Sequence, residues 1–385
     1  MFKKSLAAVA VLGAFAGSAL AADVQLYGLV DLGLNWTQTD KSTGTGTEDT
    51  FALKDGQNSP SRFGLKGTED LGNGYTVGFL LENGFSADDG QLGNGSRLFG
   101  REALLFVQTP FGEISAGRTG SLDAGTGRYN LMGSGSSAFG TGWDTVGAST
   151  VVLLGTGDRM DNTLTYKSPS FAGFNLYAQV SLKKDNKASD TDADPAETGD
   201  ASVDGAEGSS DADRYYAVAA TYGAGALKAG LIYSQTDYSH YAVKAGDDNA
   251  AQVVSAYVNY DFGMVKPMLA VQYWDGALAS DGAKPTFRSP TTKGYGVVAS
   301  AVAPLVGGTF KASVGYNDYE PVSAGAATDY DGNNLMVGVG YEYPLSKRTS
   351  VYTAAGYNQT EKDKVAGGTD KVKTTEVMVG MIHKF

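Results

Sequence analysis

The side chains that enzymes use as nucleophiles, bases and soft metal ligands are scarce in this sequence. Its 385 residues include no cysteine and only two histidines, His240 and His383. A Cys nucleophile, a thiolate metal site and a disulfide are therefore excluded, and a His-based triad or zinc site has little to build on. We expect no enzyme activity, no metal and no cofactor. An excess of 42 acidic over 30 basic residues also argues against nucleic-acid binding.

Several arginines, in contrast, lie in alternating segments, where the position of the residue decides which face of the strand carries its charge. Arg62 alternates with the apolar residues Phe63 and Leu65, and Arg159 shares its parity with Asp161 and Thr163. Side chains on a strand point alternately to opposite faces, so Arg62 and Arg159 should both lie on a polar face. Fixed charges in that position can orient water and select ions.

Two further arginines are ambiguous by the same test. Arg101 stands next to Glu102, and only one of the two can face the polar side of a regular strand. Arg118 shares its parity with the apolar Ile114 and Ala116. It therefore reaches the polar face only if a bulge or the end of the strand intervenes.

The segments that carry these residues belong to a long series of alternating strands. In the last one, Val377, Val379 and Met381 share one parity, and Glu376 and Lys384 share the other. Each segment thus has an apolar and a largely polar face. We predict sixteen strands, at 24–37, 60–67, 74–83, 99–109, 112–119, 160–167, 173–183, 213–222, 226–236, 251–261, 265–275, 293–303, 308–319, 333–343, 349–359 and 374–385.

The connections between these strands alternate between short and long. Seven are short, such as 109–112 and 303–308, and eight are long, such as 38–59 and 184–212. Most strands approach the ~9–11 residues that a tilted membrane strand needs. Short turns on one side and long loops on the other are typical of outer-membrane barrels. The predicted fold is an all-β, 16-stranded antiparallel transmembrane β-barrel.

The first 21 residues have the layout of a secretory signal peptide. Lys3 and Lys4 precede an apolar stretch, and Ala19-Leu20-Ala21 resembles a cleavage site. We therefore expect 1–21 to be removed and 22–385 to form the barrel. The expected location is the outer membrane of a Gram-negative cell.

Several blocks of the chain resemble Gram-negative general porins, in particular the trimeric porins of β-proteobacteria. The resemblance covers essentially the whole mature chain, in the order of the family, and its blocks are VQLYGLVDLGL (24–34), SRFGLKGTEDLGNGYTVGFLLENGF (61–85), FGREALLFVQTPFGEISAGR (99–118), DNTLTYKSPSFAGFNLYAQ (161–179), LSKRTSVYTAAGYN (345–358) and GMIHKF (380–385). The resemblance implies a homotrimer of barrels for passive diffusion of ions and small hydrophilic solutes. It also implies contact with outer-membrane lipid and lipopolysaccharide.

The resemblance also implies that the third outer loop folds into the barrel as a constriction. That loop is 120–158, which is rich in glycine and aromatic residues and has few charges. By resemblance, Arg62, Arg101 and Arg159 occupy the basic wall of the constriction, with Arg118 less secure. The opposing acids would be Asp123 and Asp144 of the loop, and Glu82 could join them. These charges could instead be ordinary solvated lumen or trimer-contact residues.

The end of the chain carries a second expected signal. Phe385 closes a run with apolar or aromatic residues at alternate positions, which resembles the ending that the barrel-assembly machinery recognises. The alternative function is a substrate-selective outer-membrane channel, which would need an aromatic track or a dense basic ladder in the lumen. The acidic loop 184–212 is expected to be solvated, with weak divalent-cation bridging to lipopolysaccharide left open.

Overall fold

The computed structural model describes residues 24–42, 46–140, 142–152, 159–186, 207–208, 212–237, 250–278, 291–322, 330–364 and 367–385. The predicted signal peptide and His240 lie outside these ranges. No helix among the described residues is long and apolar enough to cross a membrane.

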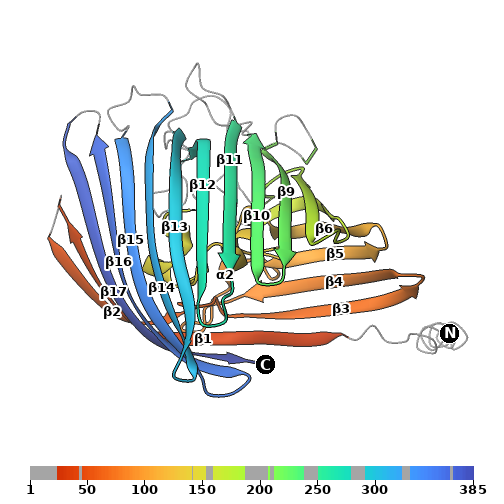
Figure 1. Cartoon of the computed structure of the whole chain (residues 1–385), viewed down its shortest axis with the longest axis horizontal. Helices are drawn as coiled ribbons and strands as arrows, with labels where there is room; N and C mark the ends of the chain where they lie inside the picture. The colour runs from red at the N-terminus through yellow and green to blue at the C-terminus, as the bar shows by residue number, and fades with distance from the viewer. Residues whose placement is uncertain are drawn as a thin grey trace, which may run out of the picture.

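Almost all of the described chain is antiparallel sheet (Figure 1). The strands are β1 (Gln25–Lys41), β2 (Thr47–Asp55), β3 (Arg62–Gly72), β4 (Tyr75–Gly84), β5 (Glu102–Thr109), β6 (Gly112–Gly120), β7 (Arg159–Lys167), β8 (Phe174–Ser181), β9 (Arg214–Ala224), β10 (Leu227–Asp237), β11 (Ala250–Tyr260), β12 (Lys266–Leu278), β13 (Thr291–Leu305), β14 (Gly308–Pro321), β15 (Tyr330–Pro344), β16 (Thr349–Lys364) and β17 (Thr369–Lys384).

The strands close into a ring, which confirms the predicted 16-stranded barrel. From β3 onward each strand pairs with the next, and β17 pairs with β1 over the register Leu29↔Lys384 to Lys41↔Val372. The other edge of β1 pairs first with β3 and then with β2. Segments β2 and β3 therefore form one ring position, which is interrupted by residues 56–61.

One predicted loop is wrong in part. Residues 38–59 were expected to be a loop, but β1 continues to Lys41 and Thr47–Asp55 returns beside it as β2. In the segment TEDTFALKD most residues are polar at the odd and at the even positions alike, so the alternation of polar and apolar residues does not predict a strand there. Its pairing with β1, rather than its own composition, makes it a strand.

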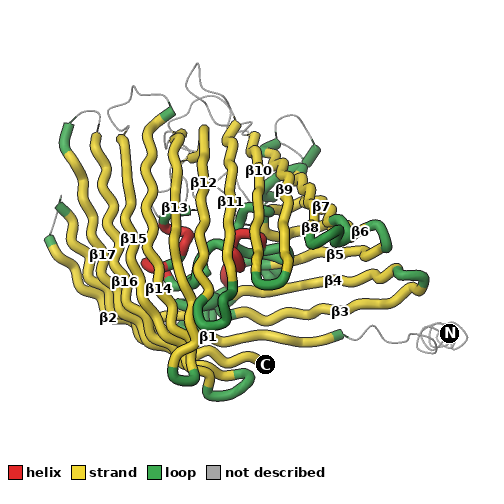
Figure 2. Tube along the Cα trace, in the orientation of Figure 1, coloured by secondary structure: helices red, strands yellow, loops and turns green. Residues whose placement is uncertain are grey.

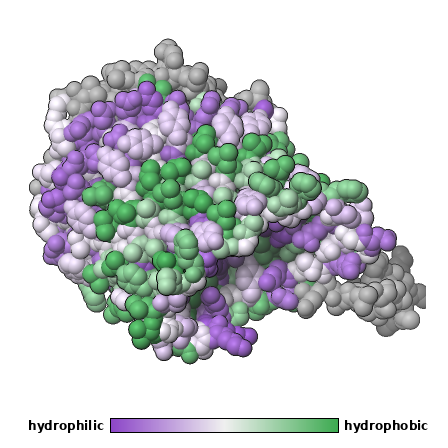
Figure 3. All heavy atoms as spheres, viewed as in Figure 1, coloured by the Kyte–Doolittle hydropathy of each residue, from purple (hydrophilic) through white to green (hydrophobic). Residues whose placement is uncertain are grey.

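The two faces of the wall have opposite chemistry. Apolar side chains such as Leu105, Val254 and Val337 are exposed on the outside, whereas Ser115 and Gln179 are buried on the inside. In Figure 3 apolar residues cover much of the middle of one outer face, and hydrophilic ones gather toward its top. This arrangement suits a wall between lipid and a polar lumen.

The loops carry the few short helices of the described chain. They are α2 (Gly93–Ser96) and, in the loop between β6 and β7, α3 (Leu131–Gly135) and the 3-10 turns η1 (Asp144–Val146) and η2 (Ala148–Thr150). Figure 2 shows helical turns behind β11–β14, at mid-height of the strands. Contacts of α3 with β10 and β11, and of η1 with β15–β17, place this loop inside the barrel, as predicted.

Candidate pore constriction

The loop 120–158, here termed the inner loop, is held inside the barrel by its apolar side chains. Near its start, Leu122 and Met132 pack with Tyr215 and Ile232 of β9 and β10. Farther along, Val151 and its neighbours pack on Val298 and Met336 of β13 and β15. Because these contacts run across the lumen from one wall to another, the inner loop narrows the channel instead of covering its mouth.

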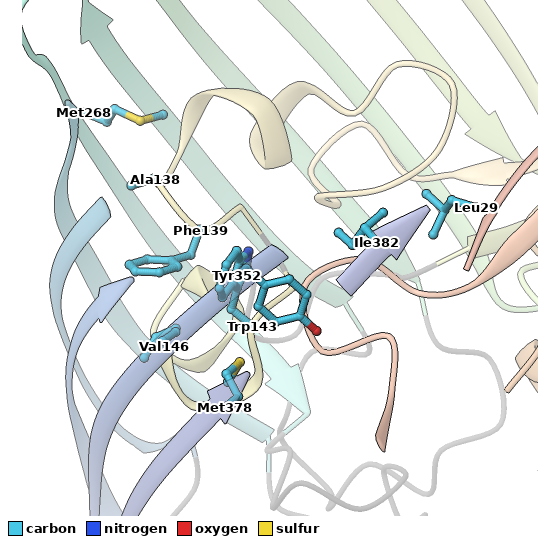
Figure 4. Close-up of a cluster of buried hydrophobic side chains, with 10 residues drawn as sticks. Leu29, Ala138, Phe139, Trp143, Val146, Met268, Tyr352, Met378 and Ile382 are labelled. Atoms are coloured by element: carbon cyan, nitrogen blue, oxygen red, sulfur yellow. The ribbon is translucent and has the colours of Figure 1, made fainter. Parts of the chain in front are cut away.

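The middle of the inner loop is anchored by an aromatic cluster (Figure 4). Trp143 is 1% exposed, and its ring lies edge-on to Phe139 and to Tyr352 of β16, with centroids 5.3 and 5.0 Å apart. Lys311 of β14 places its Nζ 4.7 Å from the centre of the same indole. Edge-on aromatic pairs and a cation over an indole are both attractive contacts, so the loop is fixed to this wall.

A polar cavity of about 870 Å³ remains between the inner loop and the opposite wall. The wall side is formed by the starts or ends of β3, β4, β5 and β7 and by residues 56–61. The ionisable side chains that line it are Asp55, Arg62, Glu82, Arg101, Glu102, Arg128 and Arg159. The structure therefore brings Arg62, Arg101, Arg159 and Glu82 of the predicted set together.

Two of these arginines share one carboxylate. Nε of Arg101 donates to Oε1 of Glu82 at 2.7 Å, and Nε of Arg62 lies 3.8 Å from Oε2. The hydroxyl of Tyr27 donates to that Oε2 at 2.9 Å. Glu82 thus lies on the same wall as the arginines rather than opposite to them, and it holds both in place.

Arg101 reaches the lumen although Glu102 does so too. The strand β5 begins at Glu102, so Arg101 lies outside its regular alternation. Its backbone N–H donates to the carbonyl of Glu82 at 3.2 Å, and Glu82 also pairs with Glu102, so two successive residues stand opposite one, as at a β-bulge. The two adjacent side chains consequently line the same cavity.

Arg159 and Glu102 form the far part of this wall. A terminal nitrogen of Arg159 donates to the hydroxyl of Thr126 in the inner loop. Glu102 is only 3% exposed, and the positive charge of Arg159 acts on its carboxylate. Arg159 therefore links the wall to the loop while offsetting a buried acid.

One arginine of the site was not predicted, and it lies on the inner loop itself. Arg128 pairs with Glu113 of β6 through two nitrogens, each 2.8 Å from a carboxylate oxygen, and it lies 3.7 Å above the ring of Phe106. Burial would lower the pKa of Arg128, but the bonds to Glu113 outweigh it and raise that pKa above its ordinary value. Arg128 therefore keeps its charge, and it places a basic side chain, paired with Glu113, on the side of the loop that lines the cavity.

The loop surface that faces the wall arginines is mostly backbone. Gly125, Gly127, Gly133, Gly140 and Gly142 line the cavity, whereas no carboxylate of the described inner-loop residues does. Glycine lets peptide groups approach closely; at Gly142 an added Cβ would lie 2.2 Å from the carbonyl oxygen of Asn58. Among the described residues of the inner loop, peptide dipoles and Arg128, instead of acidic side chains, face the basic wall.

Comparison with known proteins assigns the family. The family model for Gram-negative porins matches residues 7–363. An outer membrane porin protein of Bordetella pertussis is 30% identical, with both chains covered in full. The chain belongs to the Gram-negative porin family. It is thus a channel of the outer membrane for passive diffusion, not an enzyme.

Solved structures agree with this fold. The anion-selective porin from Comamonas acidovorans has a TM-score of 0.66 and 23% identity, over 95% of this chain and all of that one. A trimer form of OmpT from Vibrio cholerae has a TM-score of 0.60 and 15% identity, over the same shares.

The remaining predicted residues of the porin lie elsewhere. Arg118 donates to Asp161 at 2.6 Å and to the carbonyl of Gly100 at 2.8 Å, and it does not line the cavity. The pairing of β6 with β7 shifts register between Gly117 and Thr119, so this part of the wall is irregular. The shift lets Arg118 pair with Asp161 of β7 instead of lining the cavity.

Of the two predicted loop acids, Asp123 is the one whose side chain the structure describes, and it does not line the cavity opposite the arginines. Asp123 is 1% exposed and accepts hydrogen bonds from Tyr215, at 2.9 Å, and from Ser234. It therefore secures the start of the inner loop to β9 and β10, away from the cavity. Asp144 begins η1, but its side chain lies outside what the structure describes, as does Asp158.

Proposed function

We propose that this porin is a homotrimeric general diffusion channel with a modest preference for small anions, set at the cavity between the inner loop and the wall. The observation that carries the proposal is the placement of the lining charges: Arg62, Arg101 and Arg159 gather on one wall, and no carboxylate of the described inner-loop residues faces them. Such a throat attracts anions more than cations, because fixed charges act strongly at short range. The structural neighbour from Comamonas acidovorans is an anion-selective porin, which supports the same sign.

Planar-bilayer recording across a salt gradient tests this proposal. We expect conductance steps in groups of three and a reversal potential of the sign that anion flow gives. A clear cation preference in high salt would contradict the assignment of the lining arginines. Single steps only would contradict the trimer.

The trimer is also supported by the pairing of β2. Among the described strands β2 pairs only with β1, and its outward side chains Phe51 and Leu53 are 70% and 52% exposed. They lie opposite Trp36 and Leu34 of β1, in the apolar outer band. A sheet edge that faces hydrocarbon leaves backbone groups unsatisfied, so a neighbouring protomer at this edge would stabilise it.

We expect the purified porin to run as a trimer on unheated gels. The double variant Phe51→Ala and Leu53→Ala should lower the temperature at which the trimer dissociates by several degrees, because apolar contact area between protomers is lost. The control pair, Leu231→Ala with Val254→Ala, removes outward side chains from β10 and β11. A monomer by light scattering would refute the trimer. Equal effects of both pairs would refute its location at β2.

The same proposal includes the route to the membrane. Residues 1–21 would direct export, the barrel-assembly machinery would recognise the strand that ends at Phe385, and lipopolysaccharide would surround the outer half of the barrel. The exposed aliphatic band of the described strands supports the lipid contact.

A further inference from the structure

The interruption between β2 and β3 is an inward arch. Along β1, Leu29 pairs with Arg62 and Leu32 pairs with Asp55, so residues 56–61 stand opposite only two residues of β1. The extra residues cannot stay in the ladder, and they leave the wall. Residues 58–61 line the cavity together with the inner loop. We term residues 56–61 the arch.

A buried carboxylate of β1 holds the arch in shape. Asp31 is 0% exposed, and its Oδ2 accepts the backbone N–H groups of Asn58 and Ser59 at 2.9 and 2.7 Å. Its Oδ1 accepts the hydroxyl of Tyr352 at 2.6 Å. Its own backbone N–H donates to Oγ of Ser61 at 3.0 Å. The carboxylate of Asp31 thus accepts hydrogen bonds from the backbone of the arch and from Tyr352, and it joins the arch to β16.

The arch in turn holds the tip of the inner loop. The carbonyl of Gln57 accepts the N–H of Trp143 at 2.6 Å. Nδ2 of Asn35 donates to Oε1 of Gln57 at 2.9 Å and to Oε1 of Glu376 at 2.6 Å. Oε2 of Glu376 accepts the N–H of Thr145 at 3.0 Å. Two residues of the tip are therefore bound through their backbone.

The backbone at the tip is strained where it is bound. Trp143 has a φ of 69°, a left-handed conformation that is rare for a bulky side chain. Such a residue persists only when its surroundings over-determine it. Here the bond to Gln57 and the aromatic cluster around the indole do so.

We propose that Asp31, Asn35, Gln57 and Glu376 form a latch that positions the tip of the inner loop and thereby sets the width of the constriction. These are positioning residues, because they act through the arch and the loop and need not touch the solute. The inference rests on the proposed constriction and adds the residues that determine its size.

The number of hydrogen bonds that a carboxylate can accept explains why the latch contains acidic residues. Both oxygens of Glu376 accept, one from Asn35 and one from Thr145, and among the described residues neither Glu376 nor Asp31 forms an ion pair. A glutamine at 376 can accept through only one of its two terminal atoms. Its amide nitrogen would then face a donor, which leaves a buried N–H group unsatisfied.

Two substitutions test the latch from its two sides. Glu376→Gln changes the wall, and Gly142→Ala changes the tip, where an added Cβ would lie 2.2 Å from the carbonyl oxygen of Asn58. The control is Asp318→Asn, which removes a negative charge from β14 at a carboxylate bonded to Tyr316. Single-channel noise and the rate of liposome swelling with a disaccharide relative to a monosaccharide are measured. Circular dichroism and heat modifiability report on the barrel.

We expect both latch variants to form heat-modifiable barrels. The fraction of channels in which the tip of the inner loop has left the latch should increase about tenfold, which corresponds to a free-energy change of about 1.4 kcal/mol. Flickering and relative disaccharide entry should rise, and Asp318→Asn should match the wild type. Folded variants with wild-type noise and size limits would overturn the latch. If Glu376→Gln fails to fold, Gly142→Ala decides alone. An unchanged selectivity in variants of the wall arginines would refute the constriction instead, so the two failures are distinguishable.

Discussion

Replacing Arg62 and Arg159 together with alanine should move the selectivity of the porin strongly toward cations. Both guanidinium groups line the cavity, and their removal leaves Glu82 and Glu102 with fewer opposing charges. A unit charge at 4 Å is worth about 1 kcal/mol even in bulk water. We therefore expect the cation-to-anion permeability ratio to rise roughly fivefold or more, and larger solutes to pass faster because two long side chains are gone.

The control for charge is Arg62→Lys with Arg159→Lys, which should keep the reversal potential near that of the wild type. The control for position is neutralisation of Asp190, Asp192 and Asp194 in the outer loop 184–212, three residues that lie outside the described ranges. Without Lys3 and Lys4 the chain carries 28 basic and 42 acidic residues, a net charge of −14. Fields of solvated charges decay over ~8–10 Å at ordinary salt, so the loop variant should matter mainly at low salt. A larger shift from the loop variant in high salt would refute the assignment of the constriction.

Deleting Phe385 should sharply reduce the amount of folded porin in the outer membrane. The residue lies at the seam of the barrel: its N–H donates to the carbonyl of Gly28 at 3.0 Å, and its carbonyl accepts from Gly28 at 3.1 Å. Its ring lies directly over Gly28, where an added Cβ would come within 2.4 Å of it. The lost bonds amount to only ~1 kcal/mol each, so the expected loss is mainly one of recognition by the assembly machinery.

Heat-modifiable trimer in outer-membrane fractions is the measurement. Phe385→Ala separates the two effects, because it keeps the backbone bonds and removes the ring; it should be inserted as poorly as the deletion. Phe385→Tyr should be inserted well. Both defective variants should refold in detergent, since the rest of the seam between β1 and β17 is intact. Normal trimer levels after the deletion would show that the terminal ring is not an assembly signal.

Much of the barrel could be predicted because lipid imposes a simple rule. A wall between hydrocarbon and water needs side chains of opposite character at every second position, and segments such as β8 and β17 show this directly. The same rule failed for β2, whose polar residues become a strand only by pairing with β1. It also could not locate the arch, because an interruption of six residues leaves no trace in alternation.

The alternation in the sequence thus determined the barrel and the inward face of Arg62 and Arg159, and the resemblance to porins identified the loop that enters the lumen. Only the tertiary structure decided that Arg118 pairs with Asp161 and Asp123 with Tyr215 instead of lining the cavity, that Arg128 does line it, and that Glu82 stands among the arginines. The physical reason is that alternation specifies a face and nothing more. Bulges, register shifts and the resting place of a long loop depend on contacts between residues far apart in the chain, such as Trp143 with Gln57 and Tyr352.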